Sequence, residues 1–201
     1  MTTKEHWEKV YENKSPAQVS WTQERPEVSL QLIEDAKLLK SANIIDVGGG
    51  DSKLVDFLLQ DGYENITVLD ISAKALDKAK IRLGKDADRV TWIVSDIADF
   101  QPMETYDLWH DRATFHFLTT KEQIEHYQSI TSNFVSKNLI IGTFSKDGPL
   151  KCSGLEIVQY DEHSLSKIFE NSFDLIRCLT SDHITPFESV QNFQFCSFNK
   201  K

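Results

Sequence analysis

The chain has 201 residues, of which 40% are hydrophobic and 26% charged, as is usual for one globular domain with a substantial core. Its formal net charge of −9 argues against a broad phosphate-binding surface, so we expect no nucleic-acid partner. The sequence has no apolar run of membrane-spanning length and no apolar signal-peptide core near residue 1, which predicts a cytoplasmic protein with no membrane partner. Cys152, Cys178 and Cys196 show no metal-ligand spacing, and we expect them to be reduced thiols.

The beginning of the chain is predicted to be helical. Residues 4–13 have the apolar spacing of one helix, and Pro26 favours the start of a second one that carries Leu32 and Leu39 on its apolar face. Residues 1–40 are therefore expected to form an N-terminal helical lid segment ahead of the first strand.

The middle of the chain alternates between strand and helix patterns. The predicted strands are residues 44–47, 66–70, 90–94, 106–110 and 139–144. Each is a continuous apolar run, as expected for strands buried on both faces. Helices are predicted between them, with Ser72 as an N-cap and Thr120 with Gln123 as a capping box. Repeated strand–helix–strand units predict a parallel sheet covered by helices on both sides.

The last part of the chain predicts a helix from Asp161 to about residue 171, followed by strands at residues 173–179 and 193–198. A short connection between adjacent strands favours an antiparallel pair. The predicted fold class is therefore α/β, with a doubly wound, mostly parallel seven-stranded sheet, the last strand antiparallel, and helices on both faces. We expect a single domain, 1–201, in which residues 41–145 form a cofactor-binding core and residues 146–201 the C-terminal helix and strand pair.

A glycine turn follows the first predicted strand in the sequence Asp46-Val47-Gly48-Gly49-Gly50-Asp51-Ser52. Glycine has no Cβ, so a ligand could approach the main-chain N–H groups of such a turn. The dinucleotide pattern Gly-x-Gly-x-x-Gly would require a third glycine where Lys53 stands, so the pattern for NAD is incomplete. Asp70, which ends the second strand, does not distinguish these cofactors, because an acid there could hold the ribose of NAD or of another nucleoside.

Over roughly residues 40–145 the chain resembles the class I S-adenosylmethionine-dependent methyltransferases. That family has an acid and then Gly-x-Gly-x-Gly after its first strand, and Ser52 stands in the last glycine place. The resemblance implies S-adenosylmethionine as cofactor, with its ribose hydroxyls on Asp70, its adenine amino group on Asp96 and its adenine ring beside Ile97. The predicted cofactor residues are Trp21, Asp46, Gly48, Gly49, Gly50, Ser52, Asp70, Ile71, Asp96, Ile97 and His110.

The segment after the fourth strand is rich in polar residues, and the methyl acceptor is expected there. His110, Asp111 and Arg112 are the predicted catalytic residues, because a histidine beside an aspartate suits a general base and an arginine suits a carboxylate. The alternative is that Asp111 and Arg112 form a structural ion pair. No metal is expected, because these histidines and acids match no ligand spacing. Residues 20–23 and 146–154 are predicted to roof the site.

The acceptor is expected to be a small molecule or a protein side chain. Asp111-Arg112-Ala113-Thr114 is faintly similar to the Asp-Lys-Gly-Thr of a small methyltransferase group that includes citrate synthase lysine methyltransferase, although Arg112 and Ala113 depart from it. One alternative function is an NAD(P)-dependent oxidoreductase, against which Lys53 and Asp96 argue. The other is a non-catalytic binding protein, which would not need an intact glycine turn with both acids.

Overall fold

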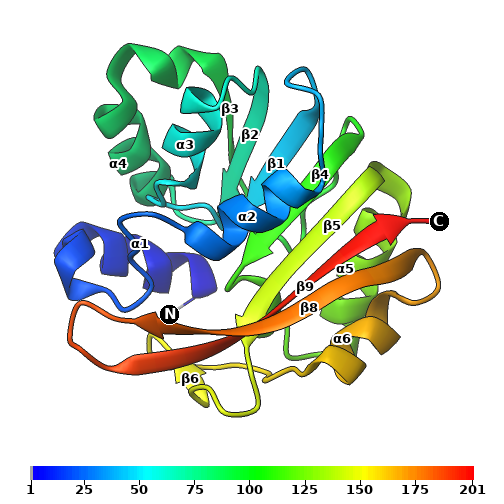
Figure 1. Cartoon of the computed structure of the whole chain (residues 1–201). Helices are drawn as coiled ribbons and strands as arrows, with labels where there is room; N and C mark the ends of the chain where they lie inside the picture. Colours follow the sequence, from blue (N-terminus) through cyan, green and yellow to red (C-terminus); the bar gives the residue numbers. More distant parts are fainter. Residues whose placement is uncertain (1) are drawn as a thin grey trace.

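The chain forms one seven-stranded sheet with helices on both faces (Figure 1). This computed structural model describes residues 2–201; residue 1, the first of the predicted lid segment, lies outside them. β9 runs antiparallel to both of its neighbours, and all other neighbouring strands are parallel. The predicted fold class is confirmed. In sheet order the strands are β3 (Val90–Val94), β2 (Asn65–Asp70), β1 (Asn43–Val47), β4 (Tyr106–Arg112), β5 (Val135–Phe144), β9 (Val190–Lys200) and β8 (Phe173–Ile184).

Two of the helices begin at the capping residues predicted from the sequence. Ser72 Oγ accepts a hydrogen bond from the backbone N–H of Ala75 at 3.2 Å, and Thr120 forms a capping box with Gln123. The second helix ends at Asp35 rather than reaching Leu39. The helices are α1 (Thr3–Asn13), α2 (Glu27–Asp35), α3 (Leu54–Gln60), α4 (Ala73–Leu83), α5 (Lys121–Phe134) and α6 (Glu162–Phe169), with three 3₁₀ turns at Pro16–Gln18, Gly84–Arg89 and Phe115–Phe117.

The sheet is buried on both faces by two apolar clusters. Leu108 of β4 belongs to the cluster under α2, α3 and α4, whereas Trp109 belongs to the cluster under α5 and α6. Figure 1 shows α2 on one side of the sheet and α5 and α6 on the other. Since successive side chains of a strand point to opposite faces, His110 and Arg112 lie on the α2 face and Asp111 on the α5 face.

The strand order reverses between β1 and β4. From β1 the chain moves outward through β2 and β3, and it then returns to place β4 on the other side of β1. In doubly wound sheets, ligands bind beyond the carboxyl ends of the strands at such a switch point. The glycine turn after β1 and the polar segment after β4 both lie there.

Two of the cysteines form a disulfide. Cys178 of β8 lies directly opposite Cys196 of β9, with the Cα atoms 4.2 Å apart, and the two sulfur atoms are bonded. The expectation of reduced thiols is therefore wrong for this pair, because spacing along the sequence does not reveal that the hairpin register makes the two residues cross-strand neighbours. Cys152 is free and buried. Among residues 2–201, no helix is long and apolar enough to cross a membrane.

Candidate functional site

A cavity of about 410 Å³ opens at the carboxyl ends of the central strands, within the size range of small-molecule sites. Most of the predicted site residues line it, from five separate parts of the chain. Gly50 and Asp111 do not. The predicted residues along its wall are Trp21, Asp46, Gly48, Gly49, Ser52, Asp70, Ile71, Asp96, Ile97, His110 and Arg112.

The glycine turn is tied to the neighbouring strand. The backbone N–H groups of Gly48 and Gly49 both donate to the carbonyl of Leu69, at 2.7 and 3.2 Å. These two amides are engaged within the protein, so the expectation that the turn presents its amides to a ligand is wrong for Gly48 and Gly49 and stays a prediction for Gly50. Gly48 has φ +67°, and a Cβ there would lie 1.6 Å from Thr114 Oγ1. This glycine is needed because the turn packs directly against the segment that follows β4.

Two of the three strand-end acids each use one oxygen to hold the turn that follows. Asp70 Oδ1 accepts from the N–H of Ser72 at 2.8 Å, and Asp96 Oδ1 accepts from the N–H of Ala98 at 3.0 Å. Burial raises the pKa of Asp70 to about 7, and the nearby Asp51 adds to the rise. Both acids line the cavity, so their role in a turn and a role in ligand binding are compatible.

The first acid is part of a buried hydrogen-bonded chain. His110 Nδ1 lies 2.7 Å from Asp46 Oδ1, and His110 Nε2 lies 2.9 Å from Ser29 Oγ of α2. All three residues are at most 3% exposed. Both ring nitrogens of His110 are therefore engaged within the protein. The predicted general base has no free nitrogen directed at an acceptor, and we interpret His110 as the residue that orients Asp46.

Asp111 points away from the cavity, on the α5 face. Its carboxylate accepts from the N–H groups of Thr114 and Phe115 at 2.9 and 3.1 Å, and from the hydroxyl of Tyr127 at 2.8 Å. Burial raises its pKa to about 6. The prediction that Asp111 is catalytic is corrected here: the side chain holds the turn after β4. Successive side chains of a strand point to opposite faces of the sheet, so Asp111 faces away from its neighbours His110 and Arg112.

We expect Asp111→Ala to lower the free energy of unfolding by at least about 3 kcal/mol at pH 5, because three buried donors lose their acceptor at a cost of about 1–3 kcal/mol each. At this pH the folded carboxyl, whose pKa is raised to about 6, is mostly uncharged, so the variant gains little from removing a buried charge. The melting temperature followed by circular dichroism should fall by about 6–12 °C. The matched control is Asp174→Ala, whose side chain is 69% exposed and which should melt like the wild type. An unchanged melting temperature for Asp111→Ala would contradict this role.

Arg112 lies on the cavity side of β4. Its Nη1 donates to the carbonyl of Trp21 at 3.1 Å, and its Cζ lies 4.8 Å from the centroid of the Phe193 ring. Burial lowers its pKa to about 10, so the guanidinium is still charged at neutral pH. The alternative of a structural ion pair with Asp111 is wrong, because the two side chains lie on opposite faces of the sheet.

The N-terminal helix forms part of the cavity wall. Trp7 and Tyr11 of α1 line the cavity, and Trp21 packs edge-on against both, with ring centroids 5.6 and 6.1 Å away. The apolar spacing of residues 4–13 predicts this helix, but none of its side chains is among the predicted site residues. Spacing of i and i+4 identifies one helix face without showing what that face covers, so sequence reasoning missed them.

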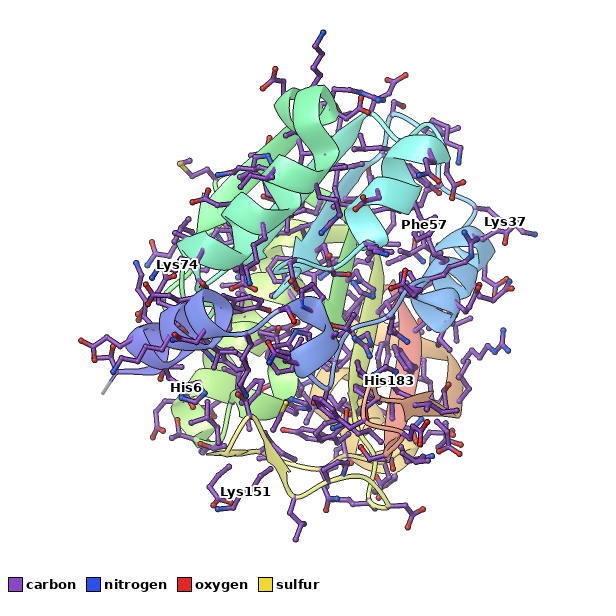
Figure 2. All side chains as sticks on the ribbon, turned by 90° about the vertical axis from the view of Figure 1, so that its left-hand side faces the viewer. His6, Lys37, Phe57, Lys74, Lys151 and His183 are labelled. Carbon is purple, nitrogen blue, oxygen red and sulfur yellow. A yellow bond between two sulfur atoms is a disulfide. The ribbon has the colours of Figure 1, made fainter. Side chains whose placement is uncertain are left out.

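Contacts with α4 and with a small hairpin hold α1 over the cavity. The Glu8 carboxylate accepts from the N–H groups of Ala73 and Lys74 at 2.9 and 3.2 Å, at the start of α4. His6 Nε2 lies 3.3 Å from Ser153 Oγ, in a small hairpin formed by β6 (Lys151–Cys152) and β7 (Leu155–Glu156). Figure 2 shows His6 on α1 and Lys151 on this hairpin at the same face of the molecule. Of the predicted roof segment 146–154, only Cys152 reaches the cavity wall.

The described part of the chain, residues 2–201, contains no group of three or more histidine, cysteine or acidic side chains that could hold a metal ion. The side chains that could hold a cofactor are instead the three acids and the aromatic residues around the cavity. Carboxylates accept hydrogen bonds from hydroxyl and amino groups, and aromatic rings cover planar groups. The cavity is suited to a nucleoside that carries a positive charge.

A family model described as a methyltransferase domain matches residues 44–133, the segment that contains the glycine turn and all three acids. The match assigns residues 44–133 to a methyltransferase domain. This confirms the resemblance found in the sequence and favours S-adenosylmethionine over NAD. The more distant similarity to the citrate synthase lysine methyltransferase group stays a prediction.

Two curated relatives of this methyltransferase domain are malonyl-[acyl-carrier protein] O-methyltransferases. The protein from Anoxybacillus flavithermus is 40% identical over 82 residues, which cover 40% of this chain and 30% of the relative. One from Ilyobacter polytropus is 26% identical over 168 residues, which cover 77% of this chain and 61% of the relative. The chain thus spans less than two thirds of the length of the curated relatives that it matches.

A solved structure has the same fold. Magnesium protoporphyrin IX methyltransferase from Synechocystis PCC 6803, with bound SAM, superposes with a TM-score of 0.67 at 19% sequence identity. The match covers 98% of this chain and 90% of that one. At this identity the likeness establishes the fold of the methyltransferase domain and not its acceptor.

Proposed function

We propose that this chain is an enzyme that binds S-adenosylmethionine across the carboxyl ends of β1, β2 and β3. It then transfers the methyl group to a small-molecule or protein side-chain acceptor at the end of β4. The observation that carries the proposal is the row of Asp46, Asp70 and Asp96 around one cavity, each at the end of a successive strand. S-adenosylmethionine supplies an electrophilic methyl group on a sulfonium, so the transfer requires no enzyme nucleophile.

The residues along the cavity fit this cofactor. Asp70 has two acceptor oxygens for ribose hydroxyls, and Asp96 beside Ile97 can accept from an adenine amino group. The buried carboxylate of Asp46 favours the positively charged methionine end, and His110 keeps that carboxylate in place. The same acids, together with Asp51, disfavour the pyrophosphate of a dinucleotide, because two negatively charged groups would share one low-dielectric cavity.

The protein's own contribution to the reaction is positioning. Trp7, Tyr11 and Trp21 cover the cavity and exclude water from it, while Thr114 and Asp111 fix the segment after β4 on which the acceptor would rest. Holding two reactants in line is worth roughly 7–11 kcal/mol of a reaction barrier. Transfer is therefore expected to depend on the rigidity of this segment and on the closed position of α1.

The kind of acceptor is tested by product release. The printed names of the curated relatives describe O-methylation of a malonyl group on acyl-carrier protein, so an acyl compound with an oxygen nucleophile is the first acceptor to assay. We expect release of S-adenosylhomocysteine above the acceptor-free rate with such a compound, and we would assay amines, thiols and protein acceptors beside it. Cofactor binding without release for any of these acceptor classes would contradict the proposed enzyme activity.

Turnover is expected to survive chelation. The sulfonium already makes the methyl group electrophilic, and the described residues hold no cluster with metal-ligand character. With an active acceptor in hand, the initial rate should be the same within about twofold before and after exhaustive dialysis against a chelator. Loss of activity that a divalent ion restores would refute metal independence, and equilibrium binding of S-adenosylhomocysteine would show that the site itself had survived the treatment.

A further inference from the structure

The buried guanidinium of Arg112 has no anionic partner within residues 2–201. One of its nitrogens, Nη1, donates to the carbonyl of Trp21, but Nε and Nη2 are buried without any hydrogen-bond partner. Buried charges in proteins are normally paired, and buried donors are normally satisfied. An arginine held in this way beside a cavity points to a ligand that supplies both the charge and the acceptor atoms.

The nearby carboxylates of the protein are already engaged. Asp46 is bonded to His110 at 2.7 Å. Asp111, the neighbour in sequence, lies on the opposite face of β4 and accepts three hydrogen bonds there. No rotation of the Arg112 side chain brings it to Asp111 through the sheet. The described residues, 2–201, therefore supply no anionic partner for Arg112.

The two free donors lie along a single edge of the guanidinium. In an arginine side chain, Nε–H and one N–H of Nη2 point in the same direction, and their spacing matches the two oxygens of a carboxylate. The Nη1 side is occupied by the Trp21 carbonyl, and one face of the group is covered by the Phe193 ring. The edge that binds a carboxylate through two parallel hydrogen bonds is thus the one without a partner.

A third donor belongs to the same wall of the cavity. The indole Nε1 of Trp21 is buried, lies near the Tyr11 hydroxyl and makes no hydrogen bond of normal geometry; an indole N–H can only donate. Trp21 and Arg112 are linked through the Trp21 carbonyl, and the preceding residue, Ser20, is fixed because its carbonyl accepts from His183 Nε2 at 2.6 Å. These donors are therefore held in place before any ligand arrives, which is the arrangement expected of a built anion site.

We propose that the methyl acceptor carries a carboxylate, which binds to Nε and Nη2 of Arg112 with support from Trp21 Nε1. This inference rests on the proposed function and specifies its acceptor class. A monoanion fits better than a phosphate, because five carboxylates already line the cavity, those of Glu24, Asp46, Asp51, Asp70 and Asp96. The other positively charged side chains along the cavity are already paired: Arg82 with Asp56, and Lys53 with Glu24.

The test uses the full chain saturated with S-adenosylhomocysteine and labelled with ¹⁵N. The probes are straight-chain monocarboxylates from acetate to octanoate, the matching primary amides, and inorganic phosphate. We expect at least one carboxylate to shift the Nε–H resonance of Arg112 and the Nε1–H resonance of Trp21, while its amide shifts neither. Arg112→Gln should weaken the binding of that carboxylate at least about tenfold and leave the affinity for S-adenosylhomocysteine unchanged within about twofold.

Arg177→Gln is the matched control, because Arg177 is 52% exposed and pairs only with Asp35 at the surface. If Arg112→Gln does not fold, Trp21→Phe removes the indole donor, keeps the ring, and should weaken the same carboxylate. The inference is overturned if no carboxylate shifts the two resonances, if acid and amide bind equally, or if phosphate alone binds. Failure of the proposed function would look different, since the wild type would then not bind S-adenosylhomocysteine at all.

Discussion

Asp70→Asn should bind S-adenosylmethionine roughly 10- to 150-fold more weakly than the wild type, because it loses charged hydrogen bonds worth about 1.5–3 kcal/mol to the ribose hydroxyls. Its unliganded form should nevertheless be the more stable one at pH 8. Burial raises the pKa of Asp70 to about 7, so the folded protein favours the protonated acid. The asparagine amide is uncharged and can still accept from the N–H of Ser72, which the Asp70 carboxylate does at 2.8 Å.

The sign of the pH dependence follows from this raised pKa. Between the unfolded pKa of about 3.9 and the folded pKa of about 7, the folded state binds more protons, so the contribution of Asp70 to stability falls as the pH rises. At pH 8 the charged, buried carboxylate costs up to roughly 4 kcal/mol, which the variant avoids. Affinity for the cofactor should rise through the same pH range in the wild type, because the ionised carboxylate is the better acceptor.

Calorimetry measures the cofactor affinity of Asp70→Asn, and thermal unfolding measures its stability; both are to be followed between pH 5 and pH 8. Asp174→Asn is the control, because its exposed carboxylate should change neither the affinity nor the melting temperature. The buried Asp111 titrates in the same direction, so the difference between wild type and Asp70→Asn isolates Asp70. Unchanged affinity in a folded Asp70→Asn variant would show that this acid does not hold the ribose.

Gly48→Ala should lower the free energy of unfolding by about 2–5 kcal/mol and abolish detectable binding of S-adenosylmethionine. The residue has φ +67°, which costs a non-glycine residue about 1–2 kcal/mol. In addition, the new Cβ would lie 1.6 Å from Thr114 Oγ1, and overpacking of this kind typically costs about 1–3 kcal/mol. To relieve this clash, either the glycine turn or the segment after β4 has to move, and both border the cavity.

The chain contains a matched control that separates the clash with Thr114 from the backbone strain. Gly62 has φ +86°, but a Cβ there would meet nothing within 4 Å. Gly62→Ala should therefore show the conformational penalty alone and bind the cofactor normally. Urea unfolding and calorimetry on both variants separate strain from contact. Equal losses of stability, or normal cofactor binding by Gly48→Ala, would contradict the packing of the turn against Thr114.

The strand ends of the core could be predicted from sequence because the signal there is local. Asp46, Asp70 and Asp96 each follow an apolar run, and parallel strands bring their carboxyl ends to one edge of the sheet. Capping residues such as Ser72 and Thr120 likewise fix helix starts through contacts three residues away. For these features, the physical cause lies within a few residues of the chain.

What the sequence did not reveal depends on contacts between distant segments. Glu8 binds the start of α4, 65 residues away, and nothing near Glu8 in the sequence indicates this. The pairing of Cys178 with Cys196 depends on hairpin register. Asp111 is a different case, since strand alternation already places it opposite His110 and Arg112. Density of polar residues suggested a catalytic cluster there, and the two-residue period of the strand shows that one member belongs to the other face.

Calorimetric titration of the wild-type chain with S-adenosylmethionine, and separately with NADH, tests the central claim most directly. The site geometry predicts saturable binding of S-adenosylmethionine at one site per chain, with an affinity that Asp70→Asn reduces and Arg177→Gln does not. It also predicts no saturable heat with NADH, because the acids of the cavity repel a pyrophosphate. Binding of NADH at this site, or a folded wild type that does not bind S-adenosylmethionine, would contradict the assignment of the cavity.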